Sequence, residues 1–96
     1  MKLAWAGPTR ADRRKIHARI AKDDPAAAIK MNELFKRRAA GLVEHPNMGR
    51  PGRVPGTREL VVQPNDILIY DVTGDMVRVL HAAQQWPPAD GSLRAR

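Results

Sequence analysis

Arginines are the residues of this sequence best suited to bind a charged ligand, and several of them fall in one short segment. The segment Met48 to Val62 carries Arg50, Arg53 and Arg58 among glycines and prolines, and it runs directly into an apolar stretch. A guanidinium holds phosphate or carboxylate through two parallel hydrogen bonds, and glycines and prolines shape the loop that presents it. We therefore expect these three arginines to gather at one rim of the predicted sheet and to bind an anionic ligand there through nucleic-acid contacts.

Arg78 and His81 follow in the last apolar stretch of the chain. Cleavage of RNA would need cations at the transition state and a base for the ribose 2′-hydroxyl. Arginine stays protonated, so His81 is the obvious acid or base, with His45 and Tyr70 as weaker candidates. The candidate catalytic residues are thus Arg58, Arg78 and His81. Simple strand alternation separates Arg78 from His81, so a bend would be needed to aim both at one ligand.

Each of these residues also has a structural interpretation. Arg78 is equally suited to an ion pair with Asp71 or Asp75. His81 is slightly better suited to a hydrogen bond at a strand end than to catalysis. The arginines of the loop are somewhat better suited to anion contact than to plain solvated charge.

The composition limits the classes of function. The chain has 17 Lys and Arg against 10 Asp and Glu, a net charge of +7 over 96 residues, which favours nucleic acid or an acidic protein segment as partner. It has no cysteine, no phosphate-binding glycine loop and no metal-ligand cluster, so we expect no cofactor and no metal. No apolar run approaches membrane-spanning length, and the sequence predicts a cytoplasmic protein.

Hydrophobic periodicity predicts an α+β fold of order β-α-α-β-β-β, in which a helical hairpin packs on a small antiparallel sheet. The first helix is expected from Thr9 as N-cap to about Lys22, with Asp12 three residues after the cap in a pattern close to a capping box. The second is expected from Asp24 as N-cap, with Pro25 in its first turn. The expected strands cover residues 2–5, 57–62, 66–72 and 76–81. We expect one domain at residues 1–87 and a flexible basic tail at residues 88–96.

Several short motifs occur in a fixed order between Leu3 and Pro87. They are Asp24-Pro25-Ala26-Ala27, His45-Pro46-Asn47-Met48-Gly49-Arg50-Pro51-Gly52-Arg53, Gly56-Thr57-Arg58-Glu59-Leu60-Val61-Val62 and Val79-Leu80-His81-Ala82-Ala83-Gln84-Gln85-Trp86-Pro87. Together they resemble the RelE/ParE superfamily of bacterial type II toxin–antitoxin toxins. The resemblance implies the same helical hairpin on a sheet, and a cognate antitoxin with which the chain forms a hetero-oligomer.

The resemblance leaves the target of the toxin open. RelE-like members cleave mRNA in the ribosomal A site, whereas ParE-like members poison DNA gyrase. Arg58 and Arg78 match basic sheet positions that contact RNA in RelE-like members, and His81 matches the histidine of a Val-Leu-His strand ending, which ParE-like members also have. We expect ribosome-dependent mRNA cleavage. The alternatives are non-catalytic inhibition of gyrase and a degenerate toxin that only binds its antitoxin.

A basic, thinly cored toxin should gain from an extended, partly acidic antitoxin segment laid over the helical hairpin. The expected antitoxin-binding residues are Ile16, Ile20, Met31 and Phe35, although the stripe on the second helix is also suited to the core. The chain departs from the family pattern in two places, of which the first bears on this contact and the second on the position of Arg78. Arg13 stands where an apolar residue is common, which suggests altered packing or altered antitoxin contact. The last hairpin, residues 66–81, also looks a few residues short.

Overall fold

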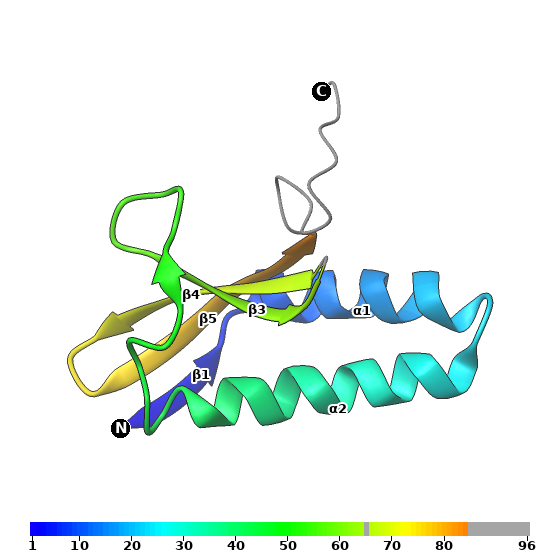
Figure 1. Cartoon of the computed structure of the whole chain (residues 1–96), viewed down its shortest axis with the longest axis horizontal. Helices are drawn as coiled ribbons and strands as arrows, with labels where there is room; N and C mark the ends of the chain where they lie inside the picture. The colour runs from blue at the N-terminus through cyan, green and yellow to red at the C-terminus, as the bar shows by residue number, and fades with distance from the viewer. Residues whose placement is uncertain (65, 85–96) are drawn as a thin grey trace.

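The computed structural model describes residues 1–64 and 66–84, and these carry seven elements (Figure 1). In chain order they are β1 (Lys2–Trp5), α1 (Gly7–Ala21), α2 (Pro25–Gly41), β2 (Arg50–Pro51), β3 (Arg58–Gln63), β4 (Asp66–Thr73) and β5 (Met76–Gln84). The predicted α+β class and element order are confirmed, with β2 as an additional short strand. The predicted tail, residues 88–96, and the end of the predicted domain lie outside the described residues.

The two helices form the predicted antiparallel hairpin, and they run side by side in Figure 1. The backbone N–H of Ala27 donates to Asp24 Oδ1 at 3.1 Å, and Pro25 opens the helix, as the sequence predicts. Neither helix of the described chain is long and apolar enough to cross a membrane.

The predicted cap of the first helix is wrong. α1 begins at Gly7, and its N-cap Ala6 has no side chain that accepts a hydrogen bond. Thr9 is fully buried and donates its hydroxyl to the carbonyl oxygen of Val79 at 2.8 Å. The backbone N–H of Ala6 donates to the same oxygen at 2.9 Å. The Thr9 hydroxyl therefore joins α1 to the sheet, where sequence reasoning assigned it to the helix end.

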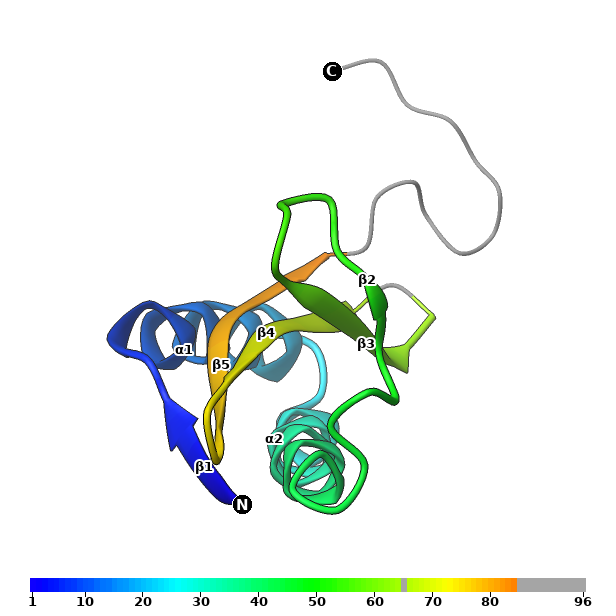
Figure 2. The same cartoon turned by 90° about the vertical axis from the view of Figure 1, so that its left-hand side faces the viewer.

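The sheet has five strands in the order β1-β5-β4-β3-β2, and Figure 2 shows it curving around α2. The antiparallel meander of β3, β4 and β5 is confirmed. β1 pairs with β5 in parallel, so the whole sheet is mixed. β5 continues to Gln84, three residues beyond the predicted end, and the last hairpin is correspondingly longer than expected.

The core lies between α2, one side of α1 and one face of the sheet, which we call the core face. Its residues are Ile16, Met31, Phe35, Ala39, Leu42, Leu60, Leu68, Tyr70, Val77, Val79 and Ala82. Side chains alternate along a strand, so Glu59, Ile69, Asp71 and Arg78 belong to the opposite face, which we call the outer face. These two faces decide which of the candidate residues lie together.

Asp66, at the start of β4, gives a stability prediction that depends on pH. Burial raises the pKa of Asp66 above its ordinary value, and the guanidinium of Arg19, 3.7 Å away, partly offsets the shift. Between the ordinary and the raised pKa the folded state binds more protons, so the unfolding free energy falls as pH rises through this window. Asp66→Asn removes this dependence and is expected to gain stability relative to the unsubstituted chain as pH rises.

Urea unfolding of both proteins at pH values below, within and above that window measures the difference. The contributions of other titrating groups cancel when the two proteins are compared at each pH. A difference in stability that stays constant across the window would contradict the prediction.

Candidate functional site

Arg58 opens β3 and lies on the core face, on the same side of the strand as Leu60. It pairs across the sheet with Tyr70, whose side chain is fully buried in the core. One Arg58 Nη atom donates to the carbonyl oxygen of Gly49 at 2.7 Å. The guanidinium also lines an open cavity of about 350 Å³, together with Asn47 and Thr57. Arg58 thus supports the loop and still faces a space that a ligand can enter.

Arg50 and Arg53 are arranged around one buried carboxylate on the outer face. Glu59 is only 5% exposed, and its Oε1 lies 3.2 Å from Arg50 Nη2. Its other oxygen accepts a hydrogen bond from the backbone N–H of Arg53 at 3.2 Å. The two residues predicted to bind nucleic acid therefore first hold the loop against the sheet, which is how Glu59 is buried without an uncompensated charge.

Arg78 forms the ion pair that the sequence offered as its structural alternative. Its Nε and Nη2 donate to the two carboxylate oxygens of Asp71 at 2.9 and 2.6 Å. Asp71 raises the pKa of Arg78 above its ordinary value, first by hydrogen bonding and then by charge. This bidentate pair lies on the outer face, because Asp71 is the direct cross-strand partner of Arg78.

A β-bulge at Leu80 places His81 on the same face as Arg78. Tyr70 pairs with Val79 while the preceding Ile69 pairs with His81, so one residue of β5 has no partner. This irregularity is the bend that sequence reasoning required. His81 is about half exposed, and its Nδ1 lies 2.9 Å from Asp12 Oδ2 of α1.

Asp12 joins α1 to the last strand. Besides His81, the same Oδ2 atom accepts a hydrogen bond from the backbone N–H of Ala82 at 3.1 Å. The sequence interpretation gave Asp12 a part in capping α1. Nothing in the local pattern indicated a contact with a strand 70 residues away.

The candidate catalytic residues therefore do not converge. Arg58 lies on the core face, whereas Arg78 and His81 lie on the outer face, although all three belong to cross-strand rows that pass through Tyr70 or next to it. The expectation that the arginines gather at one rim needs correction, because side chains alternate along β3. Arg58 lies on the core face, whereas Glu59, which pairs with Arg50, lies on the outer face. No group of three potential metal ligands occurs among residues 1–64 and 66–84.

Comparison with known proteins supplies the family. A protein-family model described as "ParE toxin of type II toxin-antitoxin system, parDE" matches residues 3–86, nearly the whole chain. The chain belongs to the ParE toxin family. It is the toxin of a type II toxin–antitoxin system, which confirms the resemblance inferred from its motifs.

Individual proteins that resemble this ParE-family toxin in sequence or in fold are also named as toxins or belong to toxin–antitoxin systems. The protein named "Putative toxin Y4kP" from Sinorhizobium fredii (strain NBRC 101917 / NGR234) is 43% identical over 76 residues, which cover 76% of this chain and 79% of that protein. The solved chromosomal ParDE toxin–antitoxin system from P. aeruginosa aligns with a TM-score of 0.79 at 25% identity, covering 88% of this chain and 95% of that one. YafQ from E. coli strain BL21(DE3) shares the fold, with a TM-score of 0.63 at 19% identity over 88% of this chain and 92% of its own.

The residues predicted to bind the antitoxin lie mostly inside this ParE-family toxin. Ile16, Met31 and Phe35 are 9%, 4% and 1% exposed and belong to the core, so they are not on the surface that a partner meets. Ile20 is half-buried at the edge of the core. It lines an open cavity of about 570 Å³ beside Ile29, which is 59% exposed. Ile20 and its exposed neighbours therefore remain candidates for the contact.

Tyr70 is a structural residue of the toxin that sequence reasoning considered only as a weak catalyst. Its hydroxyl accepts a hydrogen bond from the backbone N–H of Gly49 at 2.9 Å and donates one to the carbonyl oxygen of Pro46 at 2.7 Å. The single tyrosine in a mostly apolar strand was the available signal, since a buried tyrosine normally requires a partner for its hydroxyl.

Proposed function

We propose that this ParE-family toxin stops bacterial growth by binding DNA gyrase, without catalysis, and that a cognate antitoxin neutralises it. The observation that carries the proposal is that Arg58 lies on the core face, while Arg78 and His81 share the outer face and each already contacts a carboxylate. General acid–base cleavage of RNA needs a proton-transfer group and a transition-state cation at the same phosphate. Membership of the ParE family supports the same choice, because the resemblance associates ParE-like members with gyrase.

The outer-face residues are also engaged with carboxylates. Arg78 already directs two of its donors to Asp71, and His81 directs Nδ1 to Asp12. An RNA phosphate bound there would have to compete with two preformed carboxylate contacts. On the core face, the cavity beside Arg58 contains an arginine, an asparagine and a threonine but no histidine or carboxylate. This chemistry suits holding a partner better than moving a proton.

The proposal predicts that the function tolerates loss of the His81 imidazole. Cells induced to make the toxin alone are expected to stop growing with intact transcripts, and the purified toxin should inhibit supercoiling by purified gyrase. His81→Gln should change the inhibitory concentration by no more than about twofold, as for other exposed surface changes. If His81 is a general acid or base, its replacement should reduce transcript cleavage by about 10²- to 10⁴-fold.

Mapping transcript ends and supercoiling in the same arrested cells distinguishes the candidate functions. Newly cleaved transcripts with normal supercoiling would overturn the gyrase proposal in favour of mRNA cleavage. Continued growth with the toxin present at a normal level would indicate a degenerate toxin that only binds its antitoxin. A neutral control is Lys15→Gln, a change of an exposed side chain on α1.

A further inference from the structure

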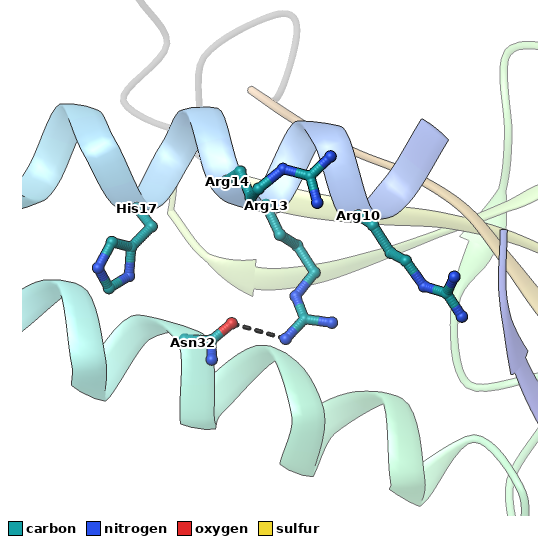
Figure 3. Close-up of a pocket in the computed structure, with 5 residues that line it drawn as sticks. All are labelled: Arg10, Arg13, Arg14, His17 and Asn32. Atoms are coloured by element: carbon teal, nitrogen blue, oxygen red, sulfur yellow. Dashed lines mark hydrogen bonds between the residues drawn. The ribbon is translucent and has the colours of Figure 1, made fainter. Parts of the chain in front are cut away.

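A cationic cleft lies between α1 and α2, on a different part of the molecule from the sheet residues discussed above. It has a volume of about 290 Å³, and Figure 3 shows the residues that line it: Arg10, Arg13, Arg14, His17 and Asn32. The four basic residues belong to α1 at spacings of three and four, which places them along one side of the helix over roughly 10 Å. We call this group the α1–α2 cleft.

Arg13 is the recessed member of the cleft. Figure 3 shows its guanidinium extending from α1 to α2, where Nη2 donates to Asn32 Oδ1 at 2.6 Å. The guanidinium carbon lies 4.5 Å from the centre of the Trp5 ring, a cation–π contact. Its Nε atom is buried and has no hydrogen-bond partner among the described residues. Arg13, which stands where the resemblance implies an apolar residue, is therefore held in place, while one of its hydrogen-bond donors is unsatisfied.

In the part of the chain that the structure describes, no ion pair compensates the positive charge of the cleft. Within residues 1–64 and 66–84, none of the cleft's basic side chains forms a salt bridge. Asp12 of the same helix is directed to His81 and the last strand. Glu33 Oε1 of α2 lies 3.9 Å from Lys36 Nζ, and the negative charge of Glu33 also acts on Arg13. Burial lowers the pKa of Arg13 and Glu33 opposes that change, yet a guanidinium stays charged at neutral pH.

We propose that the α1–α2 cleft binds carboxylate side chains from an acidic segment of the antitoxin. The inference rests on the antitoxin partner of the proposed function and is independent of the target of the toxin. A glutamate or aspartate carries its charge on a flexible stem, so it can reach Arg13 between the helices. Arg10 and Arg14 are exposed and offer two more guanidiniums to neighbouring carboxylates.

A protein segment fits this cleft better than a nucleic acid does. Phosphates are fixed to their backbone and would meet the exposed Arg10 and Arg14 before the recessed Arg13. Asn32 provides an amide at the far wall, and amide N–H groups donate to carboxylates. A chain with a net charge of +7 also gains most from a partner that carries several negative charges.

The test uses a deca-glutamate peptide as the probe and Trp5 as the reporter, since Trp5 stacks on Arg13. The protein used is the full chain with the substitution Trp86→Phe. The natural sequence has two tryptophans, so this variant keeps Trp5 as its single tryptophan. Titration with the peptide is expected to change Trp5 fluorescence. Arg14→Glu is expected to weaken peptide binding by about tenfold, the effect of losing a charge-assisted hydrogen bond.

Lys15→Glu is the matched control, because it reverses the same charge at the next residue of the same helix, outside the cleft. It is expected to weaken binding by no more than about threefold, through the change in net charge alone. Equal losses for Arg14→Glu and Lys15→Glu would overturn the proposal, because binding would then be diffuse attraction. Circular dichroism confirms that each variant is folded.

An oligothymidylate of equal charge tests the other class of ligand. If it binds more tightly than the peptide and shows the same dependence on Arg14, the cleft is a phosphate site and the carboxylate proposal fails. No change in Trp5 fluorescence and no binding of the peptide would also overturn it. None of these outcomes depends on gyrase, so failure of this inference and failure of the proposed target are separate results.

Discussion

Phe35→Ala is expected to lower the unfolding free energy by about 3–5 kcal/mol, which is the usual effect of removing a buried phenylalanine from a packed core. Phe35 is 1% exposed and contacts the core cluster from the middle of α2. Small domains have a total stability of about 5–15 kcal/mol, so the variant would lose much of it. Urea unfolding followed by circular dichroism measures the loss.

The same substitution tests whether Phe35 contacts the antitoxin. The matched control is Ile29→Ala on the same helix, which removes an apolar side chain that is 59% exposed and lines the cavity beside Ile20. Ile29→Ala should change stability by less than about 0.5 kcal/mol while weakening the toxin–antitoxin complex. A Phe35→Ala protein with unchanged stability but reduced antitoxin affinity would instead place Phe35 at the interface.

The elements of this fold were predictable because their signals are local. The apolar stripe of α2 repeats at spacings of three and four, Asp24 precedes Pro25, and Gly74, with a positive φ of 60°, forms the turn between β4 and β5. The parallel pairing of β1 with β5 joins residues more than 70 positions apart. No local pattern specifies such a pairing. Thr9 was misassigned for the same reason, since its hydroxyl bonds to a distant carbonyl.

The candidate site was less predictable, because it depends on which face of the sheet each side chain occupies. That the arginines bind an anionic ligand stays a prediction, whereas the Arg78–Asp71 pair, which the sequence offered as an alternative, is present. The bulge at Leu80 reverses the alternation of the last strand, and nothing in the sequence Val-Leu-His-Ala marks it. Likewise, Glu59 accepts hydrogen bonds from the Arg50 side chain and the Arg53 backbone. Its place in the sequence is that of any polar residue in a half-buried strand, so this role was not predictable.

Tyr70→Phe is expected to destabilise the toxin by about 1–3 kcal/mol, although it removes a single oxygen atom. The buried hydroxyl satisfies the N–H of Gly49 and the carbonyl oxygen of Pro46, and its loss leaves both backbone groups without this partner. Gly49 is also the acceptor for Arg58, so the loop and the arginine should become mobile together. Urea unfolding measures the first effect, and hydrogen exchange of the Gly49 amide measures the second.

Thr57→Val is the control for removing a hydroxyl from the same region. The Thr57 hydroxyl donates to the carbonyl oxygen of Val54 at 2.7 Å in an exposed turn, where water can replace it, so this variant should lose less than about 1 kcal/mol. The contrast isolates burial as the cause, because both variants lose one hydroxyl near the same loop. If both lose equally, or if the Gly49 amide exchanges at an unchanged rate in Tyr70→Phe, then Tyr70 does not hold the loop. The position of Arg58 would then depend on the pairing of Glu59 with Arg50 instead.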